Sequence, residues 1–317
     1  MHRPLSRIIG LTVAAALTLA ACGDDDEGGG VRDVDGTNVT SGSGSASGAA
    51  SGSAESGSGL SASEVEGSTT DDPLIQAAVS EYSIWVESQV AEMLTATTPF
   101  TDAVRAGDLD AAKAAFAPSR QAWERIEPIA GLIPDIDTKV DARVDDFASP
   151  EDPAWTGWHR IEYILWELDT TDGAAAFADQ LDADLLSLQT ELGELEITPL
   201  AMAKGAGELV EEVSEGKIQG EEDRYSHTDL WDFDANIDGA KQVVDLLSPA
   251  LEANDADLLA TVQQQFADVD EGLSAYAEGD GWMSYEALTD ADKEALQADL
   301  AALSETLATV PGTLGLE

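Results

Sequence analysis

The sequence predicts an all-α fold. From about residue 71 onward, apolar residues recur every three or four positions, as they do on one face of an amphipathic helix. Ala and Leu, which favour helices, dominate this part of the chain, and alternating runs of β-branched residues, which are typical of strands, are missing. We therefore expect a helical bundle architecture without strands.

The first expected helix carries an apolar stripe from residue 75 to residue 93. The members of the stripe are three or four residues apart: Ile75, Val79, Tyr82, Val86, Val90 and Met93. A second helix is expected from about Asp108 to Glu127, where Pro118 is expected to kink or divide it. Pro128, Gly131 and Pro134 then predict a turn.

The next expected helix begins near Pro153, carries His159 and Glu162, and ends before Asp172-Gly173. Similar apolar periodicity predicts five later helices: Ala174–Leu192, Pro199–Glu215, Thr228–Leu247, Ala256–Ala277 and Asp290–Leu307.

The N-terminus predicts a lipoprotein signal peptide over residues 1–21. A short basic stretch precedes an apolar run from Ile8 to Ala21, which is too short to span a bilayer and is typical of an export signal. The sequence Leu19-Ala20-Ala21-Cys22 is similar to a bacterial lipobox, and Cys22 is the only cysteine of the chain. We expect Cys22 to be lipidated, which anchors the protein to the extracytoplasmic side of the bacterial cell membrane; an ordinary secretory signal is the alternative.

Two further segments follow the predicted signal. Residues 22–70 consist mainly of Gly, Ser, Ala and acidic residues, a composition that cannot bury enough apolar surface to fold and that predicts a disordered tether. Residues 71–317 are long enough for one large helical domain or for two smaller bundles that share a core.

The formal net charge is −48. Nucleic acid is therefore excluded as an expected partner, since phosphate binding needs clusters of Lys and Arg that this chain lacks. Dissolved cations are attracted to such a surface, although solubility alone explains most of the excess charge.

The pattern Trp-x-Arg-Ile-Glu occurs twice, at residues 123–127 and 158–162. Residues three apart in a helix share a face, so one copy offers Glu124 with Glu127 and the other offers His159 with Glu162. Two packed helices of this kind aim three carboxylates and one imidazole at one point, as in the metal sites of four-helix bundles. The alternative is that the Trp and Ile residues pack in a core while the charged residues form surface ion pairs.

An acidic segment lies between the two copies. Asp137, Asp141 and Asp145 are four residues apart, so on a helix they share a face, and Asp141 is the one that we expect to reach the metal site. A solvated acidic face is the alternative explanation.

A second histidine, His227, lies in an aromatic and acidic segment. Ser226 followed three residues later by Asp229 predicts a helix capping box, which gives His227 a local structural role. A second metal site formed by His227 with Asp229 and Asp232 is the alternative, and we favour the capping box.

Residues 123–128, 135–143, 155–166 and 225–240 together closely resemble the imelysin-like domain of the EfeO/EfeM type, from the Efe iron-uptake family. The resemblance runs in order from about Asp72 to the C-terminus. It implies two four-helix bundles in one domain and a protein that passes iron to a membrane permease of the EfeU type, alongside a haem peroxidase of the EfeB type.

The family's His-x-x-Glu motif falls on His159 and Glu162, and its upstream acidic ligands fall on Glu124, Glu127 and Asp141. Longer relatives carry a cupredoxin domain where this sequence has the Gly/Ser-rich segment, so the resemblance is to the short form.

The chemistry of these residues agrees with iron. Carboxylates and one imidazole form an oxygen-rich site that suits Fe²⁺, Fe³⁺ or Mn²⁺ and lacks the thiolates that favour copper(I). Other divalent metals are expected to compete, since copper and zinc bind more tightly than ferrous iron to most sites.

We expect a binding protein and not an enzyme, with two alternatives. An imelysin-like metallopeptidase is one, but the chain has no His-Glu-x-x-His motif. A polysaccharide-binding protein is the other, in which four tryptophans stack on sugars: Trp155, Trp158, Trp166 and Trp231.

Overall fold

The computed structural model describes residues 70–316. The predicted signal peptide, Cys22 and the predicted tether up to residue 69 lie outside the described residues. The α-helices are α2 (Pro73–Ala106), α3 (Leu109–Ile126), α4 (Pro134–Val140), α5 (Gly157–Trp166), α6 (Ala175–Leu192), α7 (Pro199–Glu215), α8 (Asp229–Asn254), α9 (Ala256–Ser274), α10 (Asp290–Leu307) and α11 (Val310–Thr313). Short 3-10 turns lie at η1 (Glu127–Leu132), η2 (Val144–Asp146), η3 (Lys217–Gln219) and η4 (Tyr285–Ala287).

The predicted all-α class is confirmed, but the expectation of no strands is wrong at one hairpin. Strands β1 (Ala277–Glu278) and β2 (Gly281–Trp282) pair in antiparallel fashion, with Glu278 opposite Gly281. The two-residue loop is Gly279-Asp280, and Gly279 has a φ of 62°. Glycine adopts this left-handed conformation without steric cost, which makes Gly-Asp a hairpin signal.

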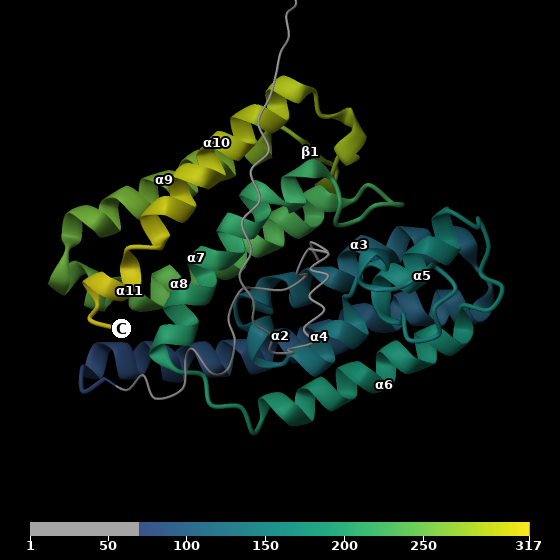
Figure 1. Ribbon diagram of the computed structural model, residues 1–317, viewed down its shortest axis with the longest axis horizontal. Helices are drawn as coiled ribbons and strands as arrows, with labels where there is room; N and C mark the ends of the chain where they lie inside the picture. Colours follow the sequence, from purple (N-terminus) through teal and green to yellow (C-terminus); the bar gives the residue numbers. More distant parts are fainter. Residues whose placement is uncertain (1–69, 317) are drawn as a thin grey trace, which may run out of the picture. The chain divides into compact units, whose positions relative to one another are not determined.

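Eight of the described helices form two four-helix bundles, whose arrangement can be followed in Figure 1. In the first, α2 packs against α3 and α6, and α5 closes the ring by contacting α3 and α6. In the second, α7, α8, α9 and α10 each pack against their neighbours in a closed ring. Helices α2 and α3 also contact α8, so the two bundles share an interface.

Helix α2 extends along both bundles (Figure 1). Its 34 residues correspond to a length of about 51 Å. The side chain of Asp72 caps its first turn, and Gly107, with a φ of 74°, ends it. The predicted apolar stripe is buried apart from Val79, which is half-buried. Pro118 does not divide α3, which is continuous from Leu109 to Ile126.

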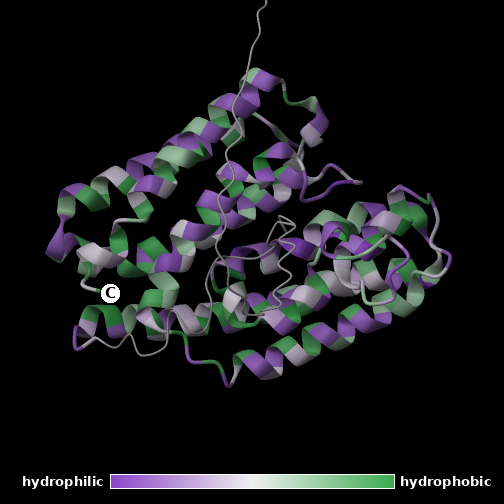
Figure 2. Ribbon diagram, viewed as in Figure 1, coloured by the Kyte–Doolittle hydropathy of each residue, from purple (hydrophilic) through white to green (hydrophobic). Residues whose placement is uncertain are grey.

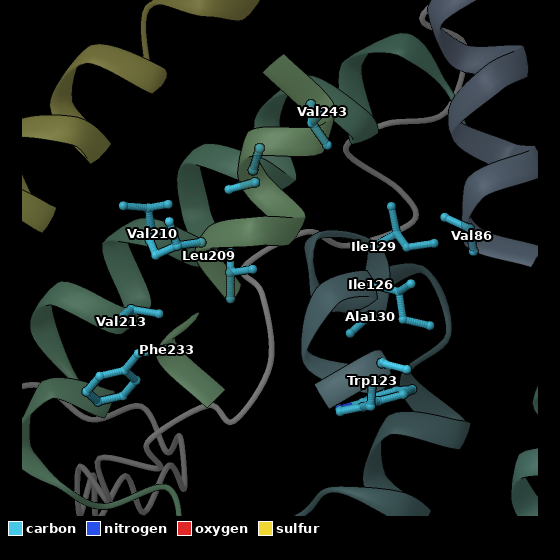
Figure 3. Close-up of a cluster of buried hydrophobic side chains, with 14 of the residues drawn as sticks. Val86, Trp123, Ile126, Ile129, Ala130, Leu209, Val210, Val213, Phe233 and Val243 are labelled. Carbon is cyan, nitrogen blue, oxygen red and sulfur yellow. The ribbon is translucent and has the colours of Figure 1, made fainter. Parts of the chain in front are cut away.

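The apolar faces of the helices form one continuous core. Figure 2 shows apolar and polar residues on different faces of the same helices. Figure 3 draws buried side chains of one hydrophobic cluster, which takes Val86 from α2, Ile126 from α3, Leu209 from α7 and Val243 from α8. The core therefore joins the two bundles.

Two glycines permit close backbone contacts that position the polar residues described below. A Cβ atom on Gly239 of α8 would lie 2.2 Å from the carbonyl oxygen of Arg125 on α3. A Cβ atom on Gly157 would lie 2.2 Å from the carbonyl oxygen of Val140, at the end of α4. These contacts bring α8 against α3, and the start of α5 against the end of α4.

Across residues 70–316, none of the helices is both long enough and apolar enough to cross a membrane.

Candidate metal centre

A buried polar cluster lies where α3, α5 and α8 meet the end of α4 and the loop of residues 216–228. Its twelve members, each no more than 4 % exposed, are Arg120, Glu124, Glu127, Asp141, His159, Glu162, Lys217, Glu222, Asp223, Asp229, Asp232 and Asn236. All five metal ligands expected from the sequence belong to this cluster. We call it the acidic cluster.

His159 is surrounded by carboxylates on both sides of its ring. Its Nε2 atom lies 3.5 Å from Asp141 Oδ1 and 3.5 Å from Glu222 Oε1. Its Nδ1 atom lies 3.2 Å from Glu162 Oε2 and 3.9 Å from Asp223 Oδ1. Each ring nitrogen thus forms a separate group with two carboxylates whose donor atoms are all within 4.8 Å of one another.

Glu124 and Glu127 face a different part of the acidic cluster. Lys217 Nζ lies 2.7 Å from both carboxylate oxygens of Glu127 and 3.3 Å from Glu124 Oε2. Asn236 Nδ2 also donates to both carboxylates, at 3.0 Å and 2.7 Å. The structure therefore directs these two glutamates toward Lys217 and not into either group around His159.

Arg120 lies between the carboxylates around His159 and the glutamates near Lys217, and it is a counter-ion for both groups. Its guanidinium donates to Asp141 Oδ1 and to Glu124 Oε1, both at 2.5 Å. It also lies 3.5 Å from Glu222 Oε1 and 3.5 Å from Asp232 Oδ1. A fully buried arginine is tolerated here because carboxylates surround it.

The acidic residues of α8 enlarge the acidic cluster. Asp229 and Asp232 are three residues apart and share the face of α8 that meets Asp223. Both carboxylate oxygens of Asp232 are without a hydrogen-bond partner in the part of the chain that the structure describes. Burial, with repulsion from Asp223, raises the pKa of Asp229 to about 8 and the pKa of Asp232 well above its usual range.

The predicted capping box at Ser226 is wrong. Thr228 precedes α8 and its side chain makes no cap bond, whereas Ser226 Oγ donates to Glu162 Oε1 at 2.9 Å. His227 lies outside α8 with a φ of 57°, and its Nε2 atom is 3.9 Å from Glu286 Oε1 at the surface. Asp229 and Asp232 therefore belong to the acidic cluster around His159, while His227 does not.

The predicted shared face of Asp137, Asp141 and Asp145 is also wrong. Helix α4 ends at Val140, and Asp141 is its C-cap residue, while Asp145 lies in η2 and pairs with Arg224. The end of the helix turns Asp141 alone of these three toward His159 among the described contacts.

Burial and neighbouring charges shift the pKa values of the acidic cluster. Burial and repulsion by Arg120 oppose a charge on His159, yet the carboxylates of Asp141, Glu162 and Glu222 around its ring raise its pKa well above the usual value. Burial disfavours an ionised Glu222, but Lys217 and Arg143 hold the pKa of this carboxyl well below its usual range. Burial raises the pKa of Asp223 to about 6, although Arg120 opposes this shift.

A small cavity of about 10 Å³ leads to His159 and Glu162. Arg143 and Tyr225 contribute to its lining, and Arg143 donates to Glu222 Oε2 at 3.0 Å. This space is sufficient for about one water molecule or ion. It is too small for a polymer substrate.

The tryptophans do not form a sugar platform around this cavity. Trp155 lines the cavity, but Trp155 and Trp158 are fully buried, and their indole N–H groups donate to Ala142 O and Ser119 Oγ inside the protein. Trp166 and Trp231 are only half-buried but belong to different bundles.

Sequence reasoning missed the residues that come from the loop of residues 216–228. Glu222 and Asp223 follow Glu221 in an acidic run without helical periodicity, so nothing local indicated where they point. Lys217 and Arg120 were also missed. The only indication in the sequence is that these two residues are cations in a chain that has few Lys and Arg residues.

Comparison with known proteins identifies similar chains. The family model described as Imelysin matches residues 78–310. The iron uptake system component EfeO of Yersinia pseudotuberculosis serotype I (strain IP32953) is 49% identical over 240 residues, which cover 75% of this chain and 64% of that protein. The iron uptake system component EfeO of Escherichia coli O1:K1 / APEC is 47% identical over 241 residues, which cover 76% of this chain and 64% of that protein. The chain thus spans about 64% of the length of these curated relatives.

Proposed function

Because the chain belongs to the imelysin family, we propose that it is the extracytoplasmic, lipid-anchored iron-binding component of an Efe-type uptake system. In this proposal residues 1–21 are the signal peptide, Cys22 carries the lipid, residues 22–70 are the tether, and residues 71–317 bind iron. The protein then delivers iron to an EfeU-type permease and acts alongside an EfeB-type haem peroxidase. The names of its relatives, which are iron uptake components, support a role in iron uptake.

The observation that carries the proposal is the arrangement around His159 Nε2. Asp141 Oδ1 and Glu222 Oε1 each lie 3.5 Å from this nitrogen, which is too far for a good hydrogen bond. Donor atoms about 3.4 Å apart surround a metal ion at a distance of about 2.1 Å in tetrahedral geometry. We therefore propose that iron, the cargo of the protein, binds between these three side chains.

The charge of the acidic cluster supports a cation as the ligand. Its twelve members include eight carboxylic acids but only three basic groups, Arg120, Lys217 and His159. Buried carboxylates need a counter-charge or a proton, so the excess favours a bound cation. In the proposal Glu124 and Glu127 contribute to this negative potential, from the side of the cluster that Lys217 occupies.

Calorimetric titration of the metal-free protein tests the proposal. Fe²⁺ under anaerobic conditions, Fe³⁺, Mn²⁺, Zn²⁺ and Cu²⁺ are compared, and we expect iron to bind in a saturable manner. His159→Ala should lower iron affinity at least about tenfold, or about 1.4 kcal/mol, and leave the helical content unchanged. His227→Ala is the matched control, because this histidine lies outside the acidic cluster. Equal iron affinity in wild type and His159→Ala would refute the site.

A metallopeptidase is the second candidate, because the matching family model is designated peptidase M75. A metal at His159 could in principle activate a water molecule. The cavity of about 10 Å³ disfavours this function, since a peptide bond cannot reach the metal without a large opening of the site. Release of soluble peptides from casein by the wild type, and its loss in His159→Ala, would support the peptidase.

A further inference from the structure

Glu162 is bonded to both His159 and the loop of residues 216–228. We propose that Glu162 is a positioning residue for the metal and not one of its ligands, and that it orients His159 so that Nε2 is the atom that binds the metal. The inference depends on the proposed function, since it concerns the same site. It reassigns the second residue of the His-x-x-Glu pair from the metal to the histidine.

The oxygens of Glu162 are already engaged. Oε1 accepts three hydrogen bonds, from the backbone N–H groups of Tyr225 and Ser226 at 2.9 Å and 2.7 Å and from Ser226 Oγ at 2.9 Å. A carboxylate oxygen has two lone pairs, so three donors saturate this atom. Only Oε2 is left to interact with His159.

Glu162 Oε2 lies 3.2 Å from His159 Nδ1, within hydrogen-bond distance. When a metal displaces one proton of the charged ring, the proton kept on Nδ1 is donated to this carboxylate and Nε2 presents its lone pair to the metal. Nε2 is buried and, among residues 70–316, has no hydrogen-bond partner. A carboxylate that accepts a hydrogen bond from the non-coordinating nitrogen of a histidine ligand is a recurrent arrangement in metal sites.

The alternative group, at Nδ1, is less suited to a metal. Its second carboxylate oxygen, Asp223 Oδ1, is 3.9 Å from Nδ1 and 3.6 Å from Arg120 Nε. The other oxygen of Asp223 accepts a hydrogen bond from Thr228 Oγ1. Arg120 lies beside both groups, but a metal at Nδ1 would also replace the bond between His159 and Glu162, whereas a metal at Nε2 would leave that bond in place.

Glu162 also connects the histidine to the other proposed ligand. Tyr225 and Ser226, whose backbone N–H groups bind Oε1, belong to the loop that carries Glu222. The same carboxylate thus fixes the ring of His159 and the position of the loop. Glu162 therefore fixes the position of His159 relative to Glu222, the other proposed ligand.

The substitution Glu162→Gln separates positioning from ligation. The three donors at Oε1 require an acceptor, so the amide oxygen of Gln should occupy that position and its NH₂ group should face His159 Nδ1. A donor at this place makes Nδ1 the acceptor and puts the ring proton on Nε2. Metal affinity should then fall about 10-fold to 100-fold, the usual effect of losing such a partner, while one metal per chain still binds.

The experiment is ¹⁵N NMR of the protein labelled at histidine, with Zn²⁺ as a diamagnetic probe and His227→Ala to assign the signals. We expect Zn²⁺ to shift Nε2 of His159 while the proton on Nδ1 remains. Calorimetry on Glu162→Gln should show weaker Zn²⁺ binding at unchanged stoichiometry. Glu167→Gln, an exposed position at the end of the same helix, is the matched control and should bind like the wild type. Ser226→Ala removes one donor to Oε1 and should have a smaller effect.

Loss of the Nδ1 proton on addition of Zn²⁺ would overturn the inference, because Nδ1 would then be the metal-binding atom. So would an unchanged Nδ1 signal in metal-free Glu162→Gln, because the carboxylate would then not be its partner. If Zn²⁺ and iron shift neither nitrogen, the proposed function is wrong at this site, while the comparison of the metal-free proteins still decides the role of Glu162.

Discussion

Lys217→Met should strongly destabilise the metal-free protein. The side chain of Lys217 is 1 % exposed, and its Nζ atom lies 2.7 Å from both carboxylate oxygens of Glu127. Burial raises the pKa of Glu127, and the ammonium of Lys217 opposes that shift. Methionine keeps the length of the side chain but leaves the buried carboxylate without its cation.

Removal of one partner from a buried ion pair costs about 3–5 kcal/mol. For a folded unit of this size, each kcal/mol lowers the melting temperature by about 2 °C, so Lys217→Met should melt about 6–10 °C below the wild type. Lys241→Met is the matched control. Lys241 Nζ is 2.6 Å from Asp270 Oδ2, but both side chains are exposed, and exposed pairs contribute about 1 kcal/mol or less.

The assay is scanning calorimetry with a chelator present. The double variant Lys217→Met/Glu127→Gln should recover most of the loss, because it removes the carboxylate that has lost its cation. In Lys217→Met the folded-state pKa of Glu127 stays above its unfolded value, so the penalty is present above that pKa and is relieved as the pH falls through it. A Lys217→Met protein that melts within about 2 °C of Lys241→Met, or a double variant no more stable than the single one, would refute this reasoning.

Three further predictions concern the metal and the anchor. Glu222→Ala should lower iron affinity at least about tenfold in calorimetry, because a proposed ligand is lost, whereas the exposed neighbour Glu221→Ala should not; equal effects of the two would contradict the assignment. Iron(II) affinity should fall as the pH falls through about 6, because burial raises the pKa of Asp223 to about 6 and its protonation removes a negative charge beside His159, although Asp223 is not a proposed ligand; an affinity that stays constant between about pH 7 and pH 5 would show that this group is not involved. Cys22→Ser should shift the protein from the membrane fraction into the medium or leave it as the unprocessed precursor, and normal processing with unchanged fractionation would point to another anchor.

The periodic parts of the fold were predictable from sequence, and the irregular parts were not. The stripe from Ile75 to Met93 lies on one face of α2 because apolar spacing and burial follow the same helical repeat. The start of α5 at Gly157, four residues after Pro153, depends on a contact with the end of α4 that has no local signal. The hairpin at residues 277–282 was overlooked because each strand has only two residues.

In the candidate site, too, the residues on one helix were predictable from sequence, and the contacts between distant segments were not. His159 with Glu162 was predictable as a pair because both lie on one short helix, three residues apart. The direction of Glu124 was not, since it is set by Arg120 and by Lys217, a residue 93 positions later in the chain. Ser226 shows the limit of local rules: its spacing to Asp229 predicted a cap, but the buried carboxylate of Glu162 is the acceptor of its hydroxyl.

The continuous core restricts how an ion could leave the His159 pocket. Binding proteins that close around a ligand like a clamshell need two lobes and a hinge between them. Here α2 packs on helices of both bundles, and apolar side chains of α2, α3, α7 and α8 form one cluster between them. Rotation of one bundle against the other would expose that cluster to water. Under the proposed function, we therefore expect release of the ion to be a local event, in which the bonds of Glu162 to Tyr225 and Ser226 break while the helices remain in place.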